Sequence, residues 1–96
     1  MNYRSHLLNN TLDALDRLFD RQASIVDIYA LTYATAQALR SDVLFSLFSE
    51  TAISLRAIAR AGLPIEEARE RALDATNDLR ITLAELLPFS GEPELG

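Results

Sequence analysis

The side chains best suited to chemistry in this sequence are acidic, and they follow Pro64 at helical spacing. At about 100° per residue, one face of a helix in this stretch carries Glu66, Glu67, Glu70, Asp74, Asp78 and Glu85. Like-charged pairs four residues apart destabilise a helix by roughly 0.2–0.5 kcal/mol each, so stability alone favours alternating signs. The pattern favours a surface that meets a positively charged protein. The alternative is an ordinary solvated face.

A second acidic set lies on the first predicted helix, which should run from residue 5 or 6 to residue 21. One flank of this helix carries three aspartates that lie within about 60° of one another: Asp13, Asp16 and Asp20. Arg17 on the opposite flank can pair with Asp13 at the favourable spacing of four residues. We predict that this flank joins the first set in binding a partner, and a solvated surface is again the alternative.

The groupings of side chains that enzymes use are missing from the sequence. His6 is the only histidine, and near the start of a helix it lacks the fixed partners that a general base needs. The chain has no Glu-x-x-His pair of a di-iron bundle, no glycine-rich phosphate loop and no cysteine for a disulfide or a thiolate metal site. We therefore predict a protein that is not an enzyme and holds no metal or cofactor.

The overall charge restricts the class of partner. The net charge is −5, whereas nucleic-acid binding requires a basic surface that releases counterions, so a basic protein fits better. No apolar run reaches the roughly 18–20 residues that cross a bilayer, and the first ten residues lack the apolar segment of a signal peptide. We predict a cytoplasmic protein that binds neither nucleic acid nor membrane.

The most apolar helix that must position these groups is predicted from Ser24 to Leu39. Its start carries a weak capping box, in which the side chains of Ser24 and Asp27 each accept a hydrogen bond from the other residue's backbone N–H. One side presents an apolar stripe and the other is rich in alanine. Neighbouring helices should therefore cover most of its surface.

Two more helices complete the predicted fold. One should run from residue 41 or 42 to residue 61, with Gly62 directly after its end. The other should begin with Pro64 in its first turn and stop at Pro88. Apolar residues at three- and four-residue spacing predict the core-facing stripes, which include Phe19, Val43, Ala59, Ile65 and Leu86.

These patterns predict an all-α protein with a single domain. Short connections between helices favour antiparallel neighbours, so we expect an up-down-up-down four-helix bundle over residues 1–88. Residues 89–96 contain glycine, proline and glutamate and are predicted to form a flexible acidic tail.

Two apolar residues fall outside the predicted buried arc of the third helix. Phe45 and Ile53 lie there among serine and arginine residues, and large apolar groups on an outward face can mark a contact surface. They support an alternative function as a homodimeric structural or adaptor bundle, in which the alanine side of the central helix also meets a second copy. Isolated exposed apolar residues are also common in monomers.

The segment LDRLFDRQASIVDIY, residues 15–29, resembles the opening of small helical bacterial immunity proteins, the colicin D immunity type and relatives in contact-dependent growth inhibition systems. In those proteins an apolar helix ends in a short polar turn, and an isoleucine or serine, an acidic and an aromatic residue open the second helix. The resemblance covers about a sixth of the chain.

This resemblance implies a cytoplasmic protein that binds the toxic nuclease domain of its cognate toxin. In such a complex, acidic side chains mimic the substrate phosphates and block the active site of the toxin. Such toxin domains are commonly basic, which agrees with the charge argument. No family motif identifies the binding residues, so the assignment of the acidic faces rests on charge alone.

Overall fold

The computed structural model describes residues 3–87, which form four helices and include no strand. The helices are α1 (Tyr3–Phe19), α2 (Ile25–Ala38), α3 (Phe45–Arg60) and α4 (Ile65–Leu86). The prediction of an all-helical protein with four helices is therefore confirmed. The predicted acidic tail, residues 89–96, lies outside the described residues.

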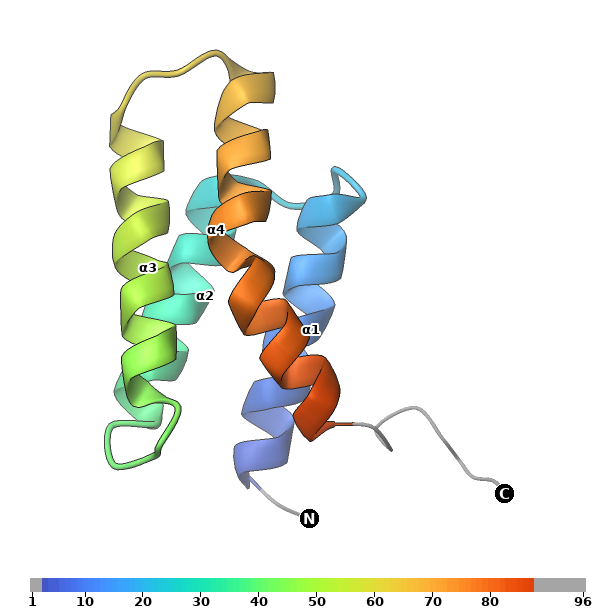
Figure 1. Cartoon of the computed structure of the whole chain (residues 1–96), viewed down its shortest axis with the longest axis vertical. Helices are drawn as coiled ribbons and strands as arrows, with labels where there is room; N and C mark the ends of the chain where they lie inside the picture. The colour runs from blue at the N-terminus through green and yellow to red at the C-terminus, as the bar shows by residue number, and fades with distance from the viewer. Residues whose placement is uncertain (1–2, 88–96) are drawn as a thin grey trace.

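The helices are neighbours in the order in which they occur along the chain. α2 contacts α1 and α3, while α4 contacts α3 and α1 and also touches α2 across the bundle. Figure 1 shows the α1–α2 and α3–α4 connections at one end of the molecule and the α2–α3 connection at the other. The α1–α4 pair and the α2–α3 pair therefore form opposite sides.

The core combines apolar side chains from all four helices with buried threonines. Its largest fully buried apolar side chains are Leu8, Leu15, Leu18, Ile28, Phe48, Leu55, Leu79 and Leu83. Four buried threonines each place their hydroxyl 2.8–2.9 Å from the carbonyl oxygen of the residue four positions earlier. They are Thr11, Thr32, Thr51 and Thr76. These hydroxyls donate hydrogen bonds to the carbonyls, so each is buried without the penalty of an unmade bond.

The start of α2 agrees with the sequence pattern. The Oγ of Ser24 accepts a hydrogen bond from the backbone N–H of Asp27 at 3.1 Å, and Oδ2 of Asp27 accepts one from the backbone N–H of Ser24 at 3.3 Å. The capping box is therefore present. Gly62 follows α3 with φ +69°, the left-handed conformation predicted for the residue after a helix.

α3 begins later than predicted because residues 39–45 form two successive turns. The backbone N–H of Asp42 donates to the carbonyl of Leu39 at 2.8 Å, and that of Phe45 donates to the carbonyl of Asp42 at 3.0 Å. The Asp42 carboxylate accepts from the N–H of Leu44 at 2.9 Å and from two guanidinium nitrogens of Arg4, one at 2.6 Å and one at 3.2 Å. This side chain connects the beginning of α1 to the α2–α3 turn.

Five residues of the predicted core stripes are instead exposed: Phe19, Val43, Ala59, Ile65 and Leu86. Phe19 is 54% exposed, Val43 87% and Ile65 80%. Phe19 is a terminal residue of α1, and Ile65 and Leu86 are the terminal residues of α4. Val43 precedes α3, and Ala59 lies in the last turn of α3. The apolar spacing continues to these positions, but the neighbouring helices do not extend far enough to cover them.

The outer side of α2 also differs from the prediction. Val26, Ala30 and Ala34 are exposed, although we expected neighbours to cover most of this helix. Among the four described helices, only α1 and α3 flank α2, and its contact with α4 lies across the core. The alanine-rich side therefore faces solvent.

Candidate functional site

Eight of the nine carboxylates in the two predicted acidic sets, all but Glu85, are the ones expected to bind a partner, and all eight are exposed. We call them the acidic face: Asp13, Asp16 and Asp20 on α1, and Glu66, Glu67, Glu70, Asp74 and Asp78 on α4. α1 and α4 are neighbouring helices, and both lie toward the viewer's right in Figure 1. None of the eight points into the core, so all are accessible to a partner.

Arginines neutralise three members of the acidic face. Nη1 of Arg21 lies 2.6 Å from Oε2 of Glu66, and this hydrogen bond holds the pKa of Glu66 below its usual value. Glu67 pairs with Arg71 at 3.2 Å within α4. Asp16 pairs across helices with Arg80 at 3.4 Å. These pairs are exposed, so each contributes little to stability.

The other five members have no ion pair with any residue between 3 and 87. They are Asp13, Asp20, Glu70, Asp74 and Asp78. The predicted pairing of Asp13 with Arg17 is therefore not formed. Glu70, Asp74 and Asp78 follow one another at four-residue spacing on α4, where their mutual repulsion is not offset by a cation.

One further carboxylate joins the acidic face from α3. Glu50 and Asp78 line the same shallow pocket of about 180 Å³ between α3 and α4, together with Ser54 and Thr51. The sequence contains no signal for this arrangement, because Glu50 is an isolated acidic residue on its own helix. The negative surface therefore extends from α1 across α4 to the edge of α3.

An exposed aromatic ring lies beside these acids. The guanidinium carbon of Arg80 is 5.4 Å from the centre of the Phe19 ring, within the range of a cation–π interaction. The same guanidinium contacts Asp16. Phe19, which the periodicity assigned to the core, thus supplies an apolar group within an acidic surface.

The end of α1 is held by the beginning of α4. Arg21 adopts φ +65°, and the backbone N–H groups of Arg21 and Gln22 donate to the carbonyls of Leu18 and Arg17, which is a Schellman motif. Nη2 of Arg69 donates to the carbonyl of Phe19. With the Arg21–Glu66 pair, this bond fixes the two helix ends relative to each other.

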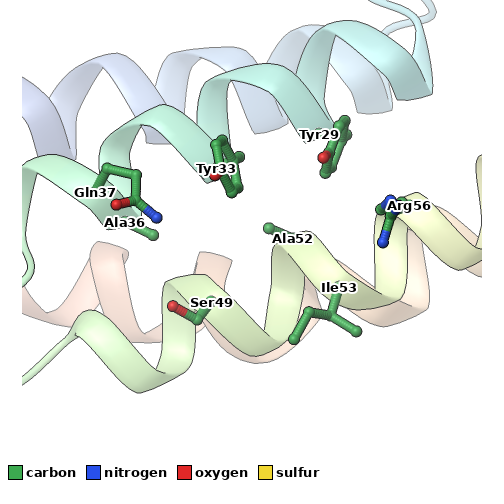
Figure 2. Close-up of a pocket in the computed structure, with 8 residues that line it drawn as sticks. All are labelled: Tyr29, Tyr33, Ala36, Gln37, Ser49, Ala52, Ile53 and Arg56. Atoms are coloured by element: carbon green, nitrogen blue, oxygen red, sulfur yellow. The ribbon is translucent and has the colours of Figure 1, made fainter.

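A groove between α2 and α3 is a second candidate site, on the opposite side of the bundle. Figure 2 shows its lining residues: Tyr29, Tyr33, Ala36 and Gln37 from α2, and Ser49, Ala52, Ile53 and Arg56 from α3. It encloses about 210 Å³. The tyrosine rings are 6.1 Å apart and tilted by 35°. We call this the α2–α3 groove.

The structure separates the two apolar residues that the sequence placed together. Ile53 is 68% exposed at the α2–α3 groove, in agreement with the prediction of an outward position. Phe45 is half-buried and packs against the core, so it is not a free surface anchor. Tyr33, 52% exposed, takes that place beside Ile53 in the groove.

Two other types of site are absent from the described part of the chain. Residues 3–87 contain no group of three or more histidine, cysteine or carboxylate side chains arranged to hold a metal ion. In the same range, no helix combines the length and apolar character needed to cross a membrane.

Comparisons with known proteins assign no family to the chain. No family model matches it, and neither curated proteins nor solved structures give a match.

Proposed function

We propose that this protein is a bacterial immunity protein that acts in the cytoplasm and neutralises a basic toxin domain of the nuclease type. In this proposal the acidic face docks onto the cationic substrate-binding surface of the toxin. The bound carboxylates occupy the positions of substrate phosphates, so the toxin cannot engage nucleic acid. The protein needs no catalytic group or cofactor for this function.

The observation that carries the proposal is the set of exposed carboxylates without an arginine partner. A surface selected only for helix stability gains nothing from placing Glu70, Asp74 and Asp78 one turn apart with the same sign. An oriented negative surface does accelerate encounter with a cationic protein and selects among partners. The resemblance of residues 15–29 to immunity proteins supports the same function.

The test first determines whether the gene immediately upstream encodes a large protein that ends in a basic domain, as the proposal requires, and then measures association with that domain. The triple variant Glu70→Gln, Asp74→Asn, Asp78→Asn removes three charges and preserves side-chain shape. We expect its association rate at low salt to fall at least tenfold, because steering by charge acts mainly on association. High salt should abolish most of the difference.

The control variant changes the net charge by the same three units, but on a different surface of the protein. The variant Ala30→Lys, Ala34→Lys, Ala38→Lys also adds three positive units, on the exposed side of α2. We expect its association rate to stay within threefold of the unmodified protein. Equal slowing by both variants, or no slowing by the first, would contradict binding through the acidic face.

A homodimeric adaptor bundle is a second candidate, and the exposure of Ile53 beside Tyr33 favours it. Sedimentation of the full chain should then show a dimer at micromolar concentration, which Ile53→Arg dissociates. A monomer before and after the substitution removes this candidate.

We also propose the antiparallel up-down-up-down order for the bundle. The pairing of consecutive helices and the alternation of the connections between the two ends support it. Spin labels at Ala30 and Ala57, on exposed positions of α2 and α3, should report a separation shorter than a parallel arrangement allows.

A further inference from the structure

The floor of the α2–α3 groove consists of small side chains. Ala36 and Ala52 are almost fully buried and lie on the sides of α2 and α3 that face each other (Figure 2). Tyr29, Tyr33 and Ile53 rise around this floor. Because alanine is short, the space above it stays open, and the groove presents an apolar bottom with walls that are partly polar.

The size of the groove fits one large side chain. Its volume of about 210 Å³ is below the roughly 300–1,000 Å³ of small-molecule pockets. Binding sites for proteins commonly bury a single apolar or aromatic anchor in a pocket of this kind. The exposed Tyr33 and Ile53 would be covered by the backbone that carries such an anchor.

The charge at the groove has the opposite sign from the acidic face. Arg56 lines the groove and is exposed, and no carboxylate is among the lining residues. Arg56 has no ion pair with any residue in the described range, and neither does Arg60 one turn further along α3. An anionic group arriving beside the apolar anchor would therefore find an unoccupied guanidinium.

This charge disfavours a second copy as the occupant. A two-fold dimer centred on the groove uses the same patch on both copies, so it brings two Arg56 side chains into one interface. Like charges across an interface are unfavourable. The groove chemistry instead matches a segment that is itself acidic.

We propose that the α2–α3 groove binds a protein segment that presents one large apolar side chain with a carboxylate within about one helical turn of it. The apolar side chain occupies the space above Ala36 and Ala52, and the carboxylate pairs with Arg56. This site lies on the side of the bundle opposite the acidic face and does not depend on the proposed toxin binding.

The test selects peptides from a random twelve-residue display library on the immobilised full-length protein. We expect enriched peptides to contain leucine, isoleucine, phenylalanine or tryptophan with aspartate or glutamate within four positions. A synthetic copy of the most enriched peptide, labelled with a fluorophore, should lose at least tenfold in affinity on Arg56→Glu. Ser49→Trp, which fills the groove, should abolish binding while the thermal unfolding curve shows a folded protein.

The matched control is Arg60→Glu, which makes the same change in charge one turn away and outside the lining residues. Its affinity for the peptide should stay within threefold of the unmodified protein. Equal losses from Arg56→Glu and Arg60→Glu overturn the proposal, and so does enrichment of basic peptides or of none. A dimer that Ile53→Arg dissociates also overturns it, because the occupant is then a second copy.

Discussion

The two sides of the bundle expose different chemistry on the same helical framework. The α1–α4 side exposes eight predicted carboxylates, five of them without an arginine partner in the described range. The α2–α3 side exposes Tyr33 and Ile53 around a groove whose lining contains an arginine and no carboxylate. One side therefore concentrates negative charge, and the other leaves apolar area open to water.

Each side departs from what folding alone requires. Repulsion along α4 lowers helix stability, and exposed apolar side chains give up burial that would be favourable. The core between them is conventional, with apolar residues from all four helices and threonines bonded to their own helices. The difference indicates that the core specifies the fold, whereas the two surfaces are available for binding.

The largest expected effect comes from the core that both sides share. Phe48 is fully buried on α3, and Phe48→Ala should lower the free energy of unfolding by about 3–5 kcal/mol, because it removes apolar contacts and leaves a cavity. Urea denaturation followed by circular dichroism measures the loss. A loss below about 1 kcal/mol would show that this core is not tightly packed.

A smaller effect is expected from the contact that joins α1 to the α2–α3 turn. Asp42→Ala removes the hydrogen bonds to Arg4 and to the N–H of Leu44, and should lower the free energy of unfolding by about 1–2 kcal/mol.

The same substitution should change how stability depends on pH. The hydrogen bond from Arg4, followed by that from the backbone of Leu44, lowers the pKa of Asp42 from its ordinary 3.8. The stabilisation is therefore present above the ordinary pKa of 3.8 and is lost as the pH falls through the lowered pKa of the folded protein. Unfolding curves of the two proteins between pH 7 and pH 2 should converge at the acidic end, and a constant difference would contradict this role.

A substitution in the acidic face should raise the free energy of unfolding instead of lowering it. Asp74→Lys replaces two repulsive pairs, with Glu70 and with Asp78, by attractive ones, so we expect the free energy of unfolding to rise by about 0.5–1 kcal/mol. The gain should disappear in 1 M salt. A destabilised variant would show that Asp74 has a structural role that its exposure does not reveal.

The smallest effect is expected from replacing one exposed isoleucine on the α2–α3 side and one on the α1–α4 side. Ile53→Gln in the α2–α3 groove and Ile81→Gln on α4 should each change the free energy of unfolding by less than about 0.5 kcal/mol, since both side chains are exposed. Thermal unfolding of the pair measures the difference. A clear loss for Ile53 alone would mean that the groove contributes to the fold.

Features determined by neighbouring residues could be predicted from the sequence. Ser24 and Asp27 are three positions apart, so their reciprocal bonds follow from local geometry, and Gly62 ends α3 for a similar reason. The exposure of the α4 carboxylates also follows from helical periodicity, because the apolar stripe fixes which face is outside.

Features that depend on the relative placement of helices could not be predicted from the sequence. Arg4 meets Asp42, and Arg80 meets Asp16, across 38 and 64 positions, and no local pattern encodes such distances. Whether Phe45 is covered depends on how far α3 is rotated against its neighbours. The periodicity of α3 left that rotation open, and the α2–α3 groove, formed by two helices together, was missed for the same reason.

The bond from Arg69 to the carbonyl of Phe19 has a consequence for synthesis on the ribosome. The last carbonyl of α1 receives its partner from a residue that is translated 50 positions later. An emerging chain can therefore form its first hairpin and the local bonds that cap α1, but the Phe19 carbonyl lacks its Arg69 partner until the final helix has left the exit tunnel. The attachment of the end of α1 to α4 is thus one of the last contacts of the molecule to form.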